Sequence, residues 1–247
     1  MISKNKLKEL AAYRQQRRCD EEAVFVVEGP KMCVEALASG FTVRVVCATS
    51  EWKAESGVGC EYYEVSQAEL ERLSNLKTPN QVWMLVERKD LKDLKAPKDL
   101  KNLILALDRI QDPGNMGTIM RTADWYGIRH IVCSHDTVDC YNPKVVQASM
   151  GAIFRTCVEY VDLPQWLAAC GMTVYGASLQ GTPLSHSHID TSTHSPKVLL
   201  IGNESRGISP EAMAQVTHPV LIPNIGGTAE SLNASVAAAI LIDRLIG

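Results

Sequence analysis

Short apolar runs alternate with helical stretches through the first third of the chain. Runs rich in β-branched residues predict strands, and the stretches of helical periodicity between them predict helices. The strands fall at 24–27, 42–47 and 82–86, and the helices at 31–39 and 67–73. This alternation predicts a small α/β domain, which we place at residues 1–90.

The next segment breaks this pattern. Residues 87–102 read ERKDLKDLKAPKDLKN, with charges of both signs around Pro97 and few side chains that a core could bury. Such a stretch is typical of a connection between domains. We therefore expect a linker at 91–102.

Stronger apolar runs follow, again separated by helical stretches. Strands are predicted at 103–107, 130–133, 173–177, 198–201 and 219–222, and helices at 116–126, 143–150, 163–170, 210–216 and about 231–245. Continuous apolar strands separated by helices are typical of a parallel sheet that helices cover on both faces. The fold expected for residues 103–247 is therefore a parallel α/β domain.

Composition narrows the class of protein. With 46% hydrophobic and 21% charged residues, a chain of 247 residues can bury a substantial core. The first ten residues are polar and no apolar run has the length of a membrane span, so we expect a cytoplasmic protein without membrane association. The eight cysteines include no Cys-x-x-Cys pair. His186, His188 and His194 lie in a polar stretch without cysteine, so no metal site is expected.

The net charge of −3 argues against a protein that coats nucleic acid through its overall field. The amino-terminal segment is the candidate for a local basic patch, because Glu9 is the only acid among its first eighteen residues. The candidate RNA-binding residues are Lys4, Lys6, Lys8, Arg14, Arg17 and Arg18. The alternative is a solvated helix face without a ligand.

Three segments that directly follow predicted strands carry the candidate chemistry, because ligands of open parallel sheets bind beyond the carboxyl ends of the strands. The first begins at Asp108 and leads into a helix that contains Arg121. Pro113 and Gly114 form a turn there, and Asn115 suits the N-cap of the helix. The spacing is not that of a dinucleotide-binding loop, but an arginine near a helix start can hold a phosphate.

The second and third segments follow the last two strands. In the second, Glu204 lies between two glycines that allow close approach of the backbone. The third enters the final, alanine-rich helix. In that segment Ser231 suits an N-cap, and Asn233 is a polar residue that needs partners if it is buried.

Together the three segments resemble the signature motifs of the SpoU family of SPOUT RNA methyltransferases, in its TrmH-like form with an amino-terminal substrate-binding domain. The motif positions are Asn115, Gly117 and Arg121, then Gly202, Glu204 and Gly207, and finally Ile222, Pro223, Ser231, Leu232 and Asn233. The resemblance is close over 103–247. It is looser over the first domain, where the stretch FVVEG at 25–29 carries it.

The resemblance implies methyl transfer from S-adenosylmethionine to a ribose 2′-hydroxyl of structured RNA. Within the catalytic set it implies, Arg121 acts either as the base or by gripping a phosphate and stabilising charge on the attacking oxygen. That set is Arg121, Asn115, Glu204, Ser231 and Asn233. The cofactor is expected on Gly202, Ile222, Leu232, Asn203 and Ser178.

The resemblance further implies a trefoil knot in the carboxy-terminal domain and a homodimer. Close packing there is expected from the small residues of the final helix, which are Ala234, Ala237, Ala238 and Ala239. The substrate-binding domain points to ribosomal RNA as the partner. The alternatives are a methyltransferase that modifies a ribose of transfer RNA, and a non-catalytic RNA-binding or ribosome-assembly factor on the same fold.

Overall fold

The computed structural model describes residues 2–53, 59–89, 103–183 and 196–246. These form two compact units, each described here by itself. The first comprises Met1–Asp90 together with Tyr141–Phe154, and the second comprises Leu91–Cys140 together with Arg155–Gly247. The expected linker at 91–102 and the three histidines of the 186–194 stretch lie outside the described residues.

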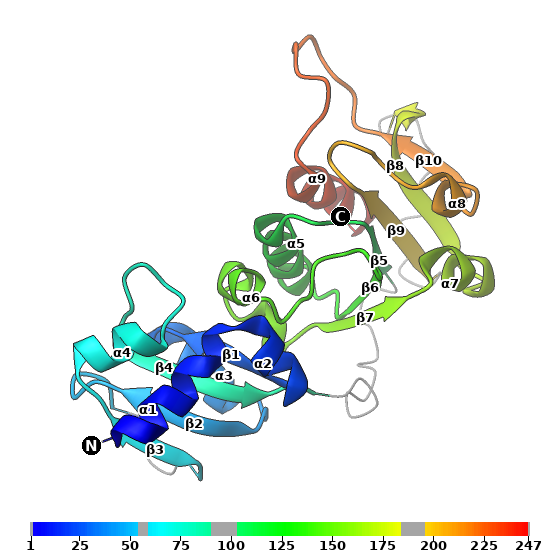
Figure 1. Cartoon of the computed structure of the whole chain (residues 1–247). Coiled ribbons are helices and arrows are strands. Elements are labelled where there is room, and N and C mark those ends of the chain that lie inside the picture. The colour runs from blue at the N-terminus through cyan, green and yellow to red at the C-terminus, as the bar shows by residue number, and fades with distance from the viewer. Residues whose placement is uncertain (1, 54–58, 90–102, 184–195, 247) are drawn as a thin grey trace. The chain divides into compact units, whose positions relative to one another are not determined.

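The first unit contains a four-stranded mixed sheet (Figure 1). Its strands, in the spatial order β1-β4-β2-β3, are β1 (Val24–Glu28), β4 (Val82–Glu87), β2 (Val43–Ala48) and β3 (Glu61–Glu64). The helices are α1 (Lys4–Ala11), the short 3₁₀ helix η1 (Ala12–Arg14), α2 (Gln16–Glu21), α3 (Pro30–Ala38) and α4 (Gln67–Leu73). Leu7 and Leu10 of α1 and Leu70 of α4 are buried in one core with Trp83 of β4, so α1 and α4 cover one face of this sheet.

A later segment of the chain completes the first unit. Helix α6 (Pro143–Ser149) packs against β1, and the 3₁₀ helix η3 (Ala152–Phe154) follows it. The ring of Phe25 in β1 lies 4.8 Å from that of Tyr141 and 6.2 Å from that of Phe154 between centroids. The sequence predicted a helix at 143–150 but gave no sign that it packs on the first sheet.

The second unit contains a six-stranded sheet in which every pair of neighbours is parallel. Its strands, in the spatial order β10-β8-β9-β5-β6-β7, are β10 (His218–Leu221), β8 (Thr173–Pro183), β9 (Lys197–Gly202), β5 (Leu103–Asp108), β6 (His130–Ser134) and β7 (Cys157–Val161). The expectation of a parallel α/β fold is thereby confirmed.

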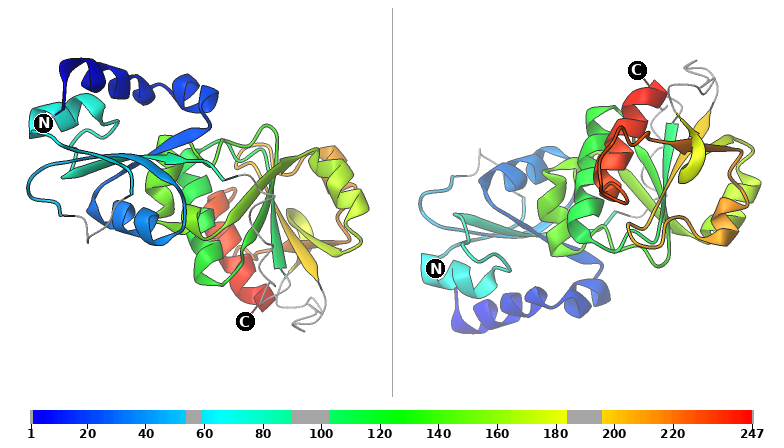
Figure 2. Two further views of the ribbon diagram at one scale, coloured as in Figure 1. Left: turned by 90° about the horizontal axis from the view of Figure 1, so that it is seen from below. Right: turned by 90° about the horizontal axis from the view of Figure 1, so that it is seen from above.

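Helices cover both faces of this sheet (Figure 2). On one face lie α5 (Pro113–Trp125) and α9 (Ala234–Ile246), and on the other lie α7 (Leu163–Ala169) and α8 (Pro210–Met213). Leu163 and Leu167 of α7 share a core with Val198 and Leu200 of β9. Successive strand residues point to opposite faces. Alternate residues of one apolar strand therefore pack towards α7 and α8 on one face and towards α5 and α9 on the other.

Two strands were not predicted from the sequence. β3 reads EYYE and is mostly exposed, and β7 reads CVEYV and is half-buried throughout. Both lie at sheet edges, where one side of a strand lacks a neighbour and the sequence needs no continuous apolar run. Within the part of the chain that the structure describes, no helix has the length and apolar character needed to cross a membrane.

Candidate active site

Helix α5 begins with a cap that the sequence interpretation had placed three residues too late. Asp112 is the N-cap, because its side-chain oxygen Oδ1 accepts a hydrogen bond from the backbone N–H of Asn115 at 2.8 Å. Pro113 occupies the first helical position, where its fixed φ favours the helix and its missing N–H costs nothing. The expectation that Asn115 caps the helix was therefore wrong. Asn115 lies inside the first turn and its side chain is free for other partners.

The loop after β9 holds Glu204 in a fixed place. The backbones of Asn203 and Gly207 exchange hydrogen bonds of 3.1 and 2.8 Å, and the Asn203 side chain donates to the carbonyl of Arg109 at 3.0 Å. Buried Asp108 at the end of β5 accepts a hydrogen bond from the backbone N–H of Ser209 at 2.5 Å. The loop is thus tied at both ends to the segment that follows β5.

Helix α9 also begins with a cap, and again at a residue other than the expected one. Asn233 Oδ1 accepts hydrogen bonds from the backbone N–H groups of Ser235 at 2.9 Å and Val236 at 3.4 Å. This is the geometry of an N-cap, so the alternative that Ser231 caps this helix was wrong. Ser231 lies in an exposed segment and has no hydrogen-bond partner among the described residues.

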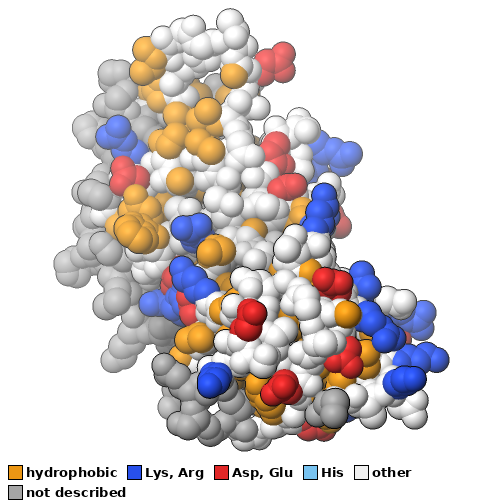
Figure 3. Space-filling model, turned by 90° about the vertical axis from the view of Figure 1, so that its left-hand side faces the viewer, with side chains coloured by type: hydrophobic (Ala, Val, Ile, Leu, Met, Phe, Trp, Pro, Cys, Tyr) orange, Lys and Arg blue, Asp and Glu red, His pale blue; other side chains and the backbone are white. Residues whose placement is uncertain are grey.

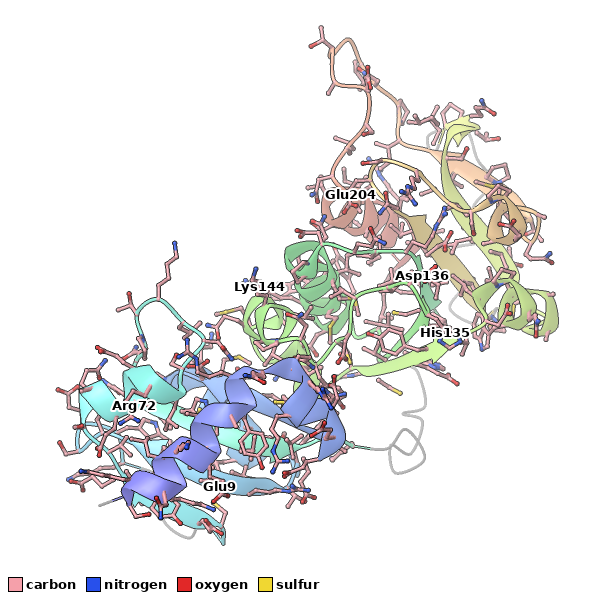
Figure 4. The ribbon with its side chains drawn as sticks, viewed as in Figure 1. Glu9, Arg72, His135, Asp136, Lys144 and Glu204 are labelled. Atoms are coloured by element: carbon pink, nitrogen blue, oxygen red, sulfur yellow. The ribbon has the colours of Figure 1, made fainter. Side chains whose placement is uncertain are left out.

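Three side chains from these segments meet in one chain of hydrogen bonds. Asn233 Nδ2 donates to Asn115 Oδ1 at 2.8 Å, and Asn115 Nδ2 in turn donates to Glu204 Oε1. Figure 4 shows Glu204 on its loop beside α9. The three residues are far apart in sequence, and the expectation that their segments converge at one edge of the sheet agrees with this geometry.

Arg121 lies outside this chain of hydrogen bonds. It is six residues after Asn115 on α5, which places it about 9 Å along the helix axis and about 120° around it. Thr118, Arg121 and Trp125 are all exposed and share one face of the helix. Among the described residues, the Arg121 guanidinium has no hydrogen bond or ion pair.

Several of the residues expected to bind the cofactor lie on or directly after three adjacent strands. Gly176 of β8 pairs with Leu200 of β9 on one side and with Pro219 of β10 on the other. Because all three strands are parallel, the residues beyond this register lie towards the same edge of the sheet: Ser178 within β8, Gly202 at the end of β9, and Ile222 directly after β10. Two apolar residues are exposed: Leu179, within β8, to 71%, and Leu232, in the segment before α9, to 45%. Asn203, by contrast, uses its side chain to hold its own loop.

Half of the candidate RNA-binding residues are already paired with acids. Lys6 forms ion pairs of 3.0 Å with Glu9 and 3.2 Å with Glu61, at a cavity of about 590 Å³ that the carboxylates of Glu22 and Glu87 also line. Arg17 and Arg18 pair with the glutamates at the end of α2. The remaining cations, exposed and without an ion pair among the described residues, are Lys4, Lys8 and Arg14.

Figure 3 shows a surface on which lysine and arginine side chains are interspersed with acidic ones. Because glutamates pair with Lys6, Arg17 and Arg18, the amino-terminal helices carry a weaker positive field than their lysine and arginine count indicated.

Several residues that hold the site were not singled out from the sequence. Asp112 caps α5, Asp108 anchors the Glu204 loop and Ser235 contacts Asn233. An aspartate directly before a proline is a common helix start, so Asp112 could have been found. No local pattern marks Asp108, because its partner Ser209 is about a hundred residues away in the sequence. Ser235 contacts Asn233 because Asn233 caps α9, whereas the sequence placed the start of this helix at about residue 231.

The sheet, its two helical layers and the three converging loops define an α/β methyltransferase domain of the SPOUT class. Residues 102–243 match the SpoU rRNA Methylase family, and residues 4–83 match the MRM3-like substrate binding domain. The chain belongs to the SpoU rRNA methylase family.

Relatives match along nearly the whole chain. It is 31% identical to the 23S rRNA (guanosine(2553)-2′-O)-methyltransferase of Bacillus subtilis, with 98% of this chain and 96% of the relative covered. A solved structure from Porphyromonas gingivalis, described as of the TrmH family, has a TM-score of 0.85 and 36% identity, covering 100% of this chain and 98% of that one. The S-adenosylmethionine-bound rRNA methyltransferase of Sinorhizobium meliloti has a TM-score of 0.84 and 28% identity, covering 99% and 95%.

Proposed function

We propose that this protein transfers the methyl group of S-adenosylmethionine to the 2′-hydroxyl of a ribose in ribosomal RNA. Membership of the SpoU rRNA methylase family gives the reaction class, and the Bacillus subtilis relative is named as a 2′-O-methyltransferase of 23S rRNA. The observation that carries the proposal is the contact of Asn115, Glu204 and Asn233 at the carboxyl edge of the parallel sheet. We also propose a cytoplasmic location, where the protein would meet this substrate.

The chemistry needs an activated hydroxyl. A bond forms between the ribose oxygen and the methyl carbon while the carbon–sulfur bond breaks, with its electron pair leaving on sulfur, and the hydroxyl proton passes to solvent water. We assign to Arg121 the binding of the phosphate beside the target ribose and the stabilisation of negative charge on the attacking oxygen. A guanidinium does not normally give up its proton in a protein, which favours this role over that of a base. Asn115, Glu204, Ser231 and Asn233 orient the ribose and shape its pocket.

The residues at the sheet edge fit the cofactor. When bound, S-adenosylmethionine supplies an electrophilic methyl group on a sulfonium. The exposed side chains of Leu179 and Leu232 offer apolar surface for a flat heteroaromatic ring. Backbone amides and carbonyls beyond the strands can bind polar edges of the ligand. The residues that hold it in this proposal are Ser178, Gly202, Asn203, Ile222 and Leu232.

We further propose a homodimer that pairs the faces formed by α5 and α9, and a trefoil knot in the second unit, as family membership suggests. Trp125 is 86% exposed and Val236 is 47% exposed, on two helices that pack against each other. Large exposed apolar residues on two packed helices are typical of an interface. Of the four small residues expected there, Ala234 and Ala238 are buried within the chain itself, which leaves Ala237 and Ala239 for contact with a partner.

RNA binding is assigned to the first unit, with domains at 1–90 and 103–247 joined by a linker at 91–102. The match of residues 4–83 to a substrate-binding domain supports this assignment. Among the six cations at the amino terminus, Lys4, Lys8 and Arg14 contribute most to phosphate contacts in this proposal, because acids neutralise Lys6, Arg17 and Arg18.

A methyl-transfer assay tests the proposed function. Purified protein is incubated with tritiated S-adenosylmethionine and either ribosomal RNA or transfer RNA, and 2′-O-methylated nucleotides are identified after digestion. We expect label in ribosomal RNA, and a loss of kcat on the order of 10² to 10⁴ in the Arg121→Ala variant. Arg244→Ala, which removes another exposed helical arginine of the same unit, is the matched control. Label in transfer RNA alone would make transfer RNA the substrate. No label in either RNA would contradict the enzymatic function and favour the alternative of a non-catalytic RNA-binding factor.

A further inference from the structure

The hydrogen bonds around Asn233 have only one permitted direction. Asn233 Oδ1 accepts from the backbone N–H of Ser235 at 2.9 Å, from the Ser235 hydroxyl at 2.6 Å and from the backbone N–H of Val236 at 3.4 Å. A backbone N–H can only donate. The carbonyl end of the Asn233 amide must therefore face α9, and its NH₂ end must face away from the helix.

This direction passes from residue to residue. The Asn233 NH₂ donates to Asn115 Oδ1 at 2.8 Å, which fixes the carbonyl end of the second amide as well. The NH₂ of Asn115 is then left to donate to Glu204 Oε1. Amide orientation is usually ambiguous because oxygen and nitrogen look alike, but here the N–H groups of α9 determine it for both asparagines.

Reversing the chain of hydrogen bonds is costly. A flipped Asn233 would turn its NH₂ towards the N–H groups of Ser235 and Val236, which would lose the acceptor that Oδ1 provides, and a hydrogen bond of this kind contributes about 1 kcal/mol. In the observed direction the chain ends on a carboxylate, which only accepts. Glu204 Oε1 is occupied in this way, while Oε2 accepts no hydrogen bond from any described residue.

We propose that Ser235 is a positioning residue for methyl transfer, because its hydroxyl reinforces the orientation of Asn233 that the N–H groups of α9 set, and so holds Glu204 where Oε2 can accept a hydrogen bond from a hydroxyl of the target ribose. This rests on the proposed function. Ser235 is 7% exposed and its hydroxyl is committed to Asn233, so it acts through Glu204. It makes the shortest of the three bonds to Asn233 Oδ1.

The test uses full-length protein with kcat, KM for RNA and Kd for S-adenosylmethionine measured separately. Ser235→Ala and the near-isosteric Ser235→Cys remove the strong donor, and we expect a fall in kcat of roughly 5- to 30-fold, as for the loss of one hydrogen bond. Kd for the cofactor and KM should stay within about twofold of the wild-type values. Ser149→Ala is the control, because it removes another buried helical hydroxyl, which donates to the carbonyl of Val146 in the first unit.

A double variant shows whether Ser235 acts through Glu204. If it does, Ser235→Ala combined with Glu204→Gln is no slower than Glu204→Gln alone, since residues that act as a unit are not additive. The role of Ser235 would be overturned if the losses of kcat from the two substitutions multiplied in the double variant. A wild-type kcat in both Ser235→Ala and Ser235→Cys would overturn it as well. If Ser235→Ala does not fold, Ser235→Cys decides. Wild-type protein that transfers no methyl group to ribose overturns the proposed function and this role with it.

Discussion

Gly202 shows how the absence of a side chain determines the position of a functional group two residues away. A Cβ atom at this position would lie 2.3 Å from the backbone carbon of Gly207 and from the nitrogen of Ile208. The neighbouring atoms are backbone and cannot rotate away. The close approach is what allows Asn203 and Gly207 to pair and the loop to present Glu204 to Asn115.

Gly202→Ala is therefore expected to displace the Glu204 loop. We expect a loss of methyl transfer of at least about tenfold, together with weaker cofactor binding by calorimetry, because the same loop borders the proposed cofactor site. Gly59→Ala is the matched control, since a Cβ there meets nothing within 4 Å. Full activity in Gly202→Ala would mean that the position of this loop does not matter for catalysis.

Glu28 in the first unit provides a prediction about pH. Burial of this side chain in β1 raises the pKa of its carboxyl above the ordinary value of 4.5, although hydrogen bonds from Ser74 and Asn75 oppose the shift. Above pH 4.5 the unfolded chain loses this proton before the folded chain does. The contribution of Glu28 to the free energy of unfolding therefore falls as the pH rises, until the folded carboxyl is ionised as well.

Urea unfolding of wild type and Glu28→Gln between pH 4 and pH 8 tests this sign. Glutamine keeps the shape of the side chain without the ionisation, so the difference in unfolding free energy should move in favour of the variant as the pH rises. Glu71→Gln, at an exposed position of α4, should show no such trend. A difference that stays constant with pH contradicts the prediction.

At the scale of single residues, the sequence was a partial guide to the site. Glu204, Asn115 and Asn233 were recognised from their motifs. Asn115 was placed at the N-cap because asparagine favours that position, and the aspartate three residues earlier takes it instead. The direct contact of Asn115 with both Glu204 and Asn233 depends on how α5 and α9 pack, which no local pattern encodes.

At the scale of elements, the first turn of α5 combines a stabilising cap with a functional side chain. Asp112→Ala removes the hydrogen bond to the backbone of Asn115 and should lower the free energy of unfolding by about 1 kcal/mol. Asp162→Ala removes the equivalent bond at the start of α7, where the side chain accepts from the N–H of Gln165 at 3.1 Å. It should cost a similar amount of stability.

The two cap variants should differ in activity. Only the turn of α5 carries Asn115, so methyl transfer should fall in Asp112→Ala and stay near the wild-type rate in Asp162→Ala. Thermal unfolding and the methyl-transfer assay, run on both, separate stability from positioning. Equal losses of activity would mean that global stability alone explains the effect.

The pattern of apolar runs predicted the buried elements far better than those at the edges. β5 and β9 lie inside the sheet and read LILALD and KVLLIG. Neighbours on both sides and helices on both faces require such runs. Within the described ranges, strand β7 pairs with β6 alone, and helix α9 begins at Ala234 because Asn233 caps it. Edge strands and helix boundaries therefore depend on contacts that the hydrophobic pattern of the sequence does not predict.

At the scale of the whole molecule, the exposed face of α5 and α9 predicts self-association. Trp125→Glu combined with Val236→Glu introduces charges where we propose that two copies meet. Light scattering after size-exclusion chromatography should give the mass of two chains for the wild type and of one chain, 27.1 kDa, for the double variant. Burying unpaired charges is unfavourable, and we expect methyl transfer to fall with dimerisation.

Val34→Glu is the control for this experiment. Val34 is also an exposed aliphatic residue, at 54%, but it lies on α3 in the first unit. This variant should remain a dimer. A wild-type protein that elutes as a single chain at micromolar concentration would contradict the proposed assembly.

The return of residues 141–154 to the first unit affects how the protein is made. When residues 2–89 have left the ribosome, all four strands of the first sheet are present, but Tyr141 and Phe154, which cover the ring of Phe25, have not been synthesised. Domains usually fold in the order of their synthesis. The first unit, however, can complete its packing only after residues 141–154 are translated, and these follow β5 and β6 in the chain. A graft of the amino-terminal unit onto another enzyme must therefore carry that later stretch along with residues 1–90.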